Sequence, residues 1–198
     1  KNKVSGGEKQ MAILRQIPKV LKFIPGKAQD LRAYFLSMQY WLAGSEENIE
    51  SLFCYLLSRY SSINNSTNME IKSPVEYPET GLYHPDLPRK ITEKLSEMPF
   101  VKNSTGTVGL LLMRSYVLSG DTAHYDEVIR SLEAKGLNVV PAFAAGLDAR
   151  PAINKYFMHN SKTSIDTLLS LTGFSLVGGP AYNSSKAAEE ALSELDVP

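Results

Sequence analysis

Apolar residues in the first third of the chain recur every three to four positions, which is the spacing of amphipathic helices. This spacing predicts helices over 8–24, 27–43 and 46–60, with Pro18 breaking or restarting the first and Ser45 capping the third. The apolar faces are Leu31, Tyr34, Phe35, Met38, Trp41 and Leu42 on the second helix, and Ile49, Leu52, Phe53, Leu56, Leu57 and Tyr60, predicted to be buried, on the third. Helices this apolar on one side must pack on one another or on the rest of a larger protein.

Residues 61–104 lack a clear helical or strand pattern over most of their length. A polar loop at 61–68 precedes four prolines within 73–88, which predict an extended connector without regular structure. Residues 89–98 fit a short helix. We therefore predict three parts: a helical segment over 1–72, a proline-rich connector with a short helix over 73–104, and a final unit over 105–198.

Three short apolar runs, each followed by a helical pattern, mark the final unit. The predicted strands are 108–113, 138–143 and 165–171. One predicted helix begins at Asp121 or Thr122, and two others span 149–157 and 184–195. This alternation indicates a Rossmann-like or flavodoxin-like α/β unit, with a parallel sheet and right-handed crossovers. A further strand would begin at 196–198, so we leave open whether the sheet is complete.

Composition and charge exclude several classes of protein. The 198 residues include 21 Lys+Arg and 21 Asp+Glu, so a broadly basic nucleic-acid surface is not expected. No apolar run is long enough to cross a membrane. The single cysteine, Cys54, rules out an internal disulfide and a cysteine-rich metal site, and we expect it to be buried and inert. The start without methionine or signal core suggests a piece of a longer protein.

Candidate binding residues follow from the predicted sheet, because ligands of open α/β sheets bind beyond the carboxyl ends of the strands. We expect Arg114, Ser115, His124 and the loop 173–179 to share that rim, where helix N-termini favour anions. An empty structural rim is the alternative. Gly178 and Gly179 are not followed by a lysine at P-loop spacing, so we interpret them as a tight turn with close backbone approach rather than a nucleotide loop.

The histidines offer weaker candidates. His84 and Asp86 lie two positions apart on a proline-bearing loop and could hold a metal or shuttle a proton. Alternatively, Asp86 caps the local backbone while His84 makes a surface hydrogen bond. His159 is expected to be exposed and structural. No HExxH or GxSxG pattern is present, so we predict no metal site from ligands close in sequence and assign no catalytic residue.

Several long runs, in one order along the chain, carry a resemblance to a known family. They are Pro18–Asp30, Ser37–Ser45, Tyr83–Asp86, Arg114–Tyr116, Asp121–Asp126, Ala145–Asp148 and Ser170–Ala181. Together they resemble the large, porphyrin-binding subunit of magnesium chelatases, with Tyr83–Asp86 similar to the bacteriochlorophyll branch in particular. The resemblance is weakest at 61–72 and 90–105. The related cobalt chelatase large subunit shares the architecture but is less similar in these runs.

The resemblance implies a function for a longer protein. The family subunit binds protoporphyrin IX and receives Mg²⁺ as substrates in chlorophyll or bacteriochlorophyll biosynthesis, while AAA+ partner subunits hydrolyse ATP. We expect this chain to be an internal segment that is inactive alone, with no cofactor bound to it and the catalytic ligands beyond Pro198. The alternatives are a non-catalytic α/β module that binds a ligand or docks a partner, or a cobaltochelatase segment. The implied location is the bacterial cytoplasm or, second, the chloroplast stroma.

Overall fold

A computed structural model describes residues 16–61, 70–160, 162–179 and 182–198, and the chain divides into two compact units at Tyr77 and Pro78. The predicted polar loop at 61–68 and the start of the first predicted helix fall largely outside the described residues. Residues 16–21 are helical and include Pro18, and a turn at Gly26, with φ of 78°, follows them. Each unit is described by itself.

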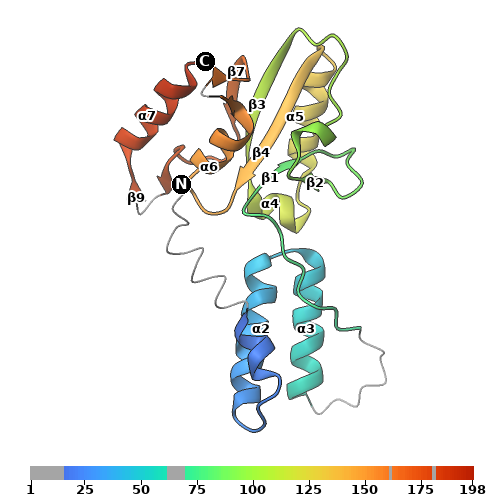
Figure 1. The fold of residues 1–198 in the computed structure, drawn as a ribbon. Coiled ribbons are helices and arrows are strands. Elements are labelled where there is room, and N and C mark those ends of the chain that lie inside the picture. Colours follow the sequence, from blue (N-terminus) through green and yellow to red (C-terminus); the bar gives the residue numbers. More distant parts are fainter. Residues whose placement is uncertain (1–15, 62–69, 161, 180–181) are drawn as a thin grey trace. The chain divides into compact units, whose positions relative to one another are not determined.

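The first unit is built around a helical hairpin, shown in Figure 1 as α2 (Ala28–Ala43) and α3 (Glu46–Tyr60). Gly44 ends α2 in the left-handed conformation, where glycine is favoured, and its N–H donates to the carbonyl of Tyr40. The Ser45 side chain then accepts a hydrogen bond from the Asn48 N–H and caps α3. Both helices and the cap confirm the sequence prediction.

The face that the hairpin buries differs from the predicted one. The buried residues are mostly small or polar: Ala33 and Tyr40 on α2, and Asn48, Ser51 and Leu52 on α3. The Asn48 side chain donates to the carbonyl of Val75 and accepts from its N–H, both at 2.9 Å, so the segment after α3 returns along the hairpin. The predicted burial of the whole α3 stripe is therefore wrong: Phe53, Leu57 and Tyr60 are exposed, because the helices meet through the narrower, less apolar face.

The second unit contains a five-stranded sheet in the order β2-β1-β4-β3-β7 (Figure 1). The strands are β1 (Thr80–Tyr83), β2 (Ile91–Thr92), β3 (Gly106–Met113), β4 (Leu137–Ala144) and β7 (Thr167–Ser170). β3 pairs in parallel with β4 and with β7, as predicted, whereas β1 is antiparallel to both β4 and β2. The α/β class is confirmed, but the sheet is mixed rather than purely parallel.

The observed structure differs from the prediction mainly in the proline-rich segment. Four residues without proline, Thr80–Tyr83, form β1 against the outer edge of β4, which satisfies backbone groups that this edge would otherwise expose. The predicted helix at 89–98 is wrong: β2 is followed there by one 3₁₀ turn, Leu95–Glu97. The Thr92 hydroxyl accepts a hydrogen bond from the Lys94 N–H, and such local side-chain bonds favour turns over helix interiors.

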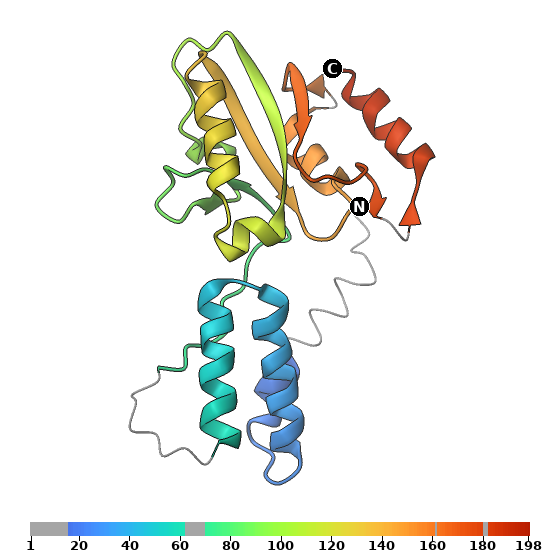
Figure 2. The ribbon, with the colours of Figure 1, turned by 180° about the vertical axis from the view of Figure 1, so that it is seen from behind.

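Helices cover both faces of the sheet, as Figures 1 and 2 show from opposite sides. On one face, α5 (Ala123–Glu133) buries Tyr125 and Ile129 against Leu110 and Leu112 of β3. On the other face lie α6 (Arg150–Ala152), a π-helical turn over Ile153–Phe157, and α7 (Ser185–Leu195). Smaller elements are helix α4 (Arg114–Ser119) and the two-residue strands β5 (Met158–His159), β6 (Lys162–Thr163), β8 (Gly178–Gly179) and β9 (Tyr182–Asn183).

The strand order predicts where a ligand site should lie. The connection from β3 through α5 leads to β4 on one side, and the connection from β4 through α6 leads to β7 on the other side of β3. This is the flavodoxin-like order, in which ligands bind where neighbouring connections diverge at the carboxyl ends. After α7, the carbonyl of Pro198 accepts a hydrogen bond of 2.8 Å from the Leu168 N–H of β7, where the sequence predicted the start of a further strand.

Candidate functional site

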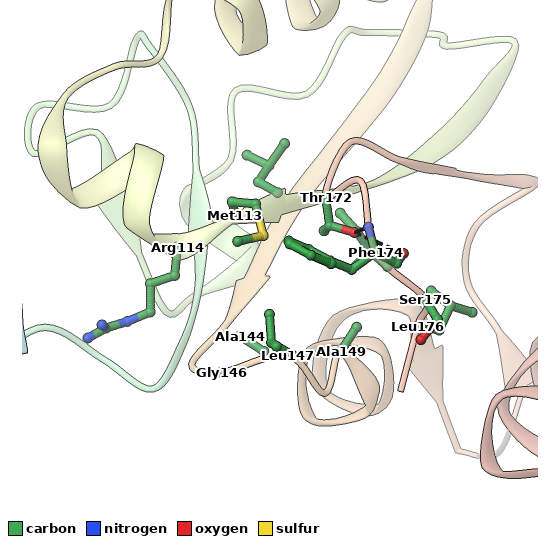
Figure 3. A pocket seen from close by; sticks show the side chains of 12 residues that line it. Met113, Arg114, Ala144, Gly146, Leu147, Ala149, Thr172, Phe174, Ser175 and Leu176 are labelled. Carbon is green, nitrogen blue, oxygen red and sulfur yellow. Dashed lines mark hydrogen bonds between the residues drawn. The ribbon is translucent and has the colours of Figure 1, made fainter. Parts of the chain in front are cut away.

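A largely apolar pocket lies at the carboxyl ends of β3 and β4 and beside the loop that follows β7 (Figure 3). Its lining residues are Leu111, Leu112, Met113, Arg114, Ala144, Gly146, Leu147, Ala149, Thr172, Phe174, Ser175 and Leu176. Figure 3 shows the Phe174 ring extending from its loop towards Met113, with Leu147 and Ala144 below it. We call this set the rim pocket, and it coincides with the edge of the sheet at which the sequence predicted a ligand.

Two loops form the wall of the rim pocket and are tied to each other through their backbones. The Ala149 N–H donates to the Leu176 carbonyl at 2.9 Å, and the Gly178 N–H donates to the Leu147 carbonyl at 3.0 Å. Gly178 has φ of 101°, a backbone conformation that suits glycine, and β8 pairs with β9 just beyond it. Gly178 and Gly179 thus form β8 just after the residues that line the wall of the pocket.

A threonine-based turn holds Phe174 at the surface. The Thr172 hydroxyl oxygen accepts a hydrogen bond from the Phe174 N–H at 3.3 Å and lies 3.1 Å from the Ser170 hydroxyl. The Phe174 side chain is left 42% exposed, and Leu147 is exposed beside it. An exposed aromatic ring over a mostly apolar floor suits a flat apolar ligand.

Among the described residues, charged groups near the rim pocket are few and already engaged. Arg114 is the only charged residue among those that line it, and its Nε donates to the Pro78 carbonyl at 3.0 Å. Asp148, in the neighbouring loop, is held by Arg150 through Nη2 at 2.6 Å and Nε at 3.0 Å. Burial tends to raise the pKa of Asp148, but the Arg150 hydrogen bonds outweigh it and lower the pKa below its usual value. Asp148 is therefore ionised at neutral pH, and its lowered pKa and its pairing with Arg150 make it a weak proton acceptor.

His124 lies outside the lining of the rim pocket. It is exposed in the first turn of α5, and its ring contacts Tyr125 at 3.9 Å and Tyr116 of α4 at 5.5 Å between centroids. Ser115, in the first turn of α4, is also exposed and does not line the pocket. The structure thus brings Arg114 to the pocket and leaves these two residues outside its lining.

His84 and Asp86 lie at the opposite edge of the sheet, because β1 runs antiparallel to β4 and its carboxyl end meets the amino end of β4. His84 is 1% exposed, and its Nε2 lies 2.9 Å from Oε1 of Glu133 on α5. Its Nδ1 accepts a hydrogen bond from the Asp86 N–H, so Nε2 carries the proton that is donated to Glu133. His84 is thus buried, so the alternative in which it makes a hydrogen bond at the protein surface is wrong.

The flanking residues of the same run also bind α5. Asp86 forms a two-pronged ion pair with Arg130, in which Nη1 and Oδ2 are 2.6 Å apart. The Tyr83 hydroxyl donates to Asp126 at 2.6 Å, and burial, followed by this hydrogen bond, raises the pKa of Tyr83 to about 12. The partners on α5 are Asp126, Arg130 and Glu133, which are four and three residues apart and therefore lie on one face of the helix. We call Tyr83–Asp86 with these partners the α5 clasp.

The described residues hold no group of three or more His, Cys, Asp or Glu placed to bind a metal. Cys54 was predicted to be buried but is only half-buried. His159 is exposed, as predicted.

The sequence analysis selected the glycines of the loop 172–179 and missed its apolar members, Phe174 and Leu176. A phenylalanine within a Ser-, Thr- and Gly-rich turn was the available signal, since such a side chain has little room to be buried locally.

Comparison with known proteins assigns the chain to a family. Residues 38–198 match the family model CobN/Magnesium Chelatase, and residues 1–35 match a Domain of unknown function (DUF3479). The chain is 59% identical over 198 residues to the H subunit of the magnesium chelatase of Cereibacter sphaeroides, covering 100% of this chain and 17% of that protein. It is 36% identical over 214 residues to the chloroplastic magnesium-chelatase subunit ChlH of Oryza sativa subsp. indica, covering 100% of this chain and 15% of that protein.

Among solved structures, the catalytic subunit of cobaltochelatase from Mycobacterium tuberculosis aligns with a TM-score of 0.45 and 16% identity, over 84% of this chain and 14% of that one. That likeness is too low to bear on fold or function here. No helix among the described residues is long and apolar enough to cross a membrane. The chain spans less than a fifth of the length of its magnesium-chelatase relatives. Because one family model matches residues 38–198, this chain belongs to the CobN/magnesium chelatase family.

Proposed function

We propose that this chain is a segment of the large subunit of a magnesium chelatase and that its rim pocket contributes part of the surface on which the porphyrin lies. The observation that carries the proposal is 59% identity to the H subunit of a magnesium chelatase across all 198 residues. The longer protein would take protoporphyrin IX and Mg²⁺ as substrates in bacteriochlorophyll or chlorophyll biosynthesis, with AAA+ partner subunits hydrolysing ATP. We favour a bacterial over a chloroplast location, because the chain is 59% identical to the Cereibacter protein and 36% identical to the rice protein.

The role proposed for this segment is binding rather than metal insertion. Mg²⁺ gives up its water reluctantly and is received by hard oxygen ligands, so insertion requires free carboxylates and a base for the pyrrole protons. Asp148, the carboxylate in the loop beside the pocket, is paired with Arg150. The exposed Phe174 ring and the apolar floor beneath it offer contact area for a flat macrocycle instead. We therefore assign the insertion chemistry to parts of the longer polypeptide outside this chain.

Porphyrin binding to the chain should depend on Phe174. We expect Phe174→Ala to weaken the affinity for protoporphyrin IX about tenfold, which corresponds to about 1.4 kcal/mol, because the ring is a principal apolar contact. Quenching of porphyrin fluorescence on titration with the chain measures the affinity. Phe100→Ala is the matched control, since Phe100 is 41% exposed but lies beside Val101, whose N–H is bound to Asn138 near the amino end of β4. Equal losses for the two variants would contradict this placement.

Arg114 should recognise a carboxylate of the porphyrin. We expect Arg114→Gln to weaken binding of protoporphyrin IX several-fold, while leaving binding of its uncharged dimethyl ester nearly unchanged, because only the free acid gains from the guanidinium. The comparison of acid with ester separates charge recognition from local unfolding, since loss of the Arg114 bond to Pro78 would affect both ligands alike. The same weakening for acid and ester would show that Arg114 acts only on structure.

A further inference from the structure

The helical hairpin of the first unit carries a broad apolar face that no described residue of that unit covers. Its members are Leu31, Tyr34, Trp41 and Leu42 on α2, each between 46% and 64% exposed. Single apolar side chains are common on protein surfaces, but four on one face of a helix, two of them aromatic, mark an interaction surface. We call this group the outer face of the hairpin.

The boundary between the two family models falls inside α2. One model ends at residue 35 and the other begins at residue 38, whereas α2 runs without a break from Ala28 to Ala43. Domain boundaries are usually exposed, flexible linkers that few contacts cross. Here a continuous helix joins the two matched regions, so the first half of α2 belongs to one family domain and the second half to the other.

The region matched by the domain of unknown function has too little core of its own. A stretch of 35 residues is below the size at which a chain buries enough surface to fold without staples. In its described part, residues 16–35, five of the eight large apolar side chains are exposed: Phe23 is 83% exposed, Val20 and Ile24 are exposed, and Leu31 and Tyr34 belong to the outer face. The small Ala33 is buried against the hairpin instead. These exposed side chains need a partner to complete a core.

We propose that the outer face of the hairpin is the docking surface for the remainder of the domain to which residues 1–35 belong, and that α2 is a helix shared between the two domains. The occupant is thus part of the same polypeptide in the longer family proteins, of which this chain spans 17% in the Cereibacter relative. A shared helix would fix the spacing of the two domains without a flexible joint. This inference rests on family membership and does not depend on porphyrin binding at the rim pocket.

Cysteine labelling at two positions of the outer face tests the proposal. Leu31→Cys and Tyr34→Cys would each be placed in the chain of 198 residues and in a longer polypeptide carrying the complete domain of unknown function. We expect maleimide to react at least tenfold more slowly at both positions in the longer polypeptide, with the modified peptides quantified by mass spectrometry. Ser58→Cys is the matched control, because Ser58 is exposed on α3 away from the outer face and should react equally in both proteins.

Three results would overturn the proposal. Equal labelling of Leu31→Cys in the two polypeptides would show that the domain does not cover the face. Protection already present in the chain of 198 residues, independent of concentration, would show that another part of the same chain covers the face. Protection that increases with protein concentration would assign the face to a second copy of the chain. Far-ultraviolet circular dichroism of each variant confirms that the helices are intact, and Tyr34→Cys provides a second site if Leu31→Cys perturbs α2.

Discussion

Phe143→Ala should lower the free energy of unfolding of the second unit by about 3–5 kcal/mol, as expected when a buried phenylalanine is truncated. Phe143 lies on β4 with no exposed surface and packs in the cluster beneath α5 with Leu110 and Ile129. Its ring also fills the space above Gly81 on the neighbouring strand, where an added Cβ would come within 2.4 Å of Cζ. Removal of the ring therefore leaves a cavity bounded by β1, β3 and α5. Chemical denaturation monitored by circular dichroism measures the loss.

The control for this prediction is an exposed phenylalanine in the same unit. Phe100→Ala removes the same atoms from a position that is 41% exposed, so we expect a loss below about 1 kcal/mol. A loss for Phe143→Ala no larger than that for Phe100→Ala would show that the core beneath α5 is loosely packed. It would also count against a preformed rim pocket, because the ends of β3 and β4 that form the pocket floor are held in place by this core.

The elements that could be predicted from sequence are those whose patterns are long and local. The periodicity of α2 and α3, with Ser45 as a cap, and the continuous apolar run of β3 determine these elements with little outside help. β1 was not predictable in this way, because four residues between prolines form a strand only when the edge of β4 is available to them. The side of α3 that is buried also depends on the partner helix. The hydrophobic pattern of α3 alone predicted burial of a side that is largely exposed.

The candidate site also has features that local sequence patterns predict and features that depend on distant residues. Alternating strands and helices placed the rim, and with it Arg114, at the carboxyl ends of the strands, because that geometry is a property of the fold class. The identity of the apolar floor depended on how the loops 145–149 and 172–178 bond to each other, which no local pattern encodes. The position of His84 relative to the rim pocket could not be predicted for a different reason. The antiparallel direction of β1, which the sequence leaves undetermined, carries His84 to the far edge of the sheet.

The buried bond between His84 and Glu133 should stabilise the second unit more than the exposed pair between Asp86 and Arg130 does. In a double-mutant cycle with alanine at both positions, we expect a coupling energy of about 1.5–3 kcal/mol for His84 with Glu133, the range for hydrogen bonds to charged groups. The corresponding coupling for Asp86 with Arg130 should be about 0.2–1 kcal/mol, because both side chains are about half exposed and screened by water. Urea denaturation at neutral pH measures all of these variants.

Two further measurements test whether His84 and Asp86 act on stability rather than on porphyrin binding. Added salt should reduce the coupling of the exposed pair and leave that of the buried pair nearly unchanged, since buried charges are screened far less. At temperatures where His84→Ala remains folded, its affinity for protoporphyrin IX should equal that of the parent chain, because the α5 clasp lies at the edge of the sheet opposite the rim pocket. A selective loss of porphyrin affinity in folded His84→Ala would instead place the ligand at the clasp and contradict its assignment to the rim.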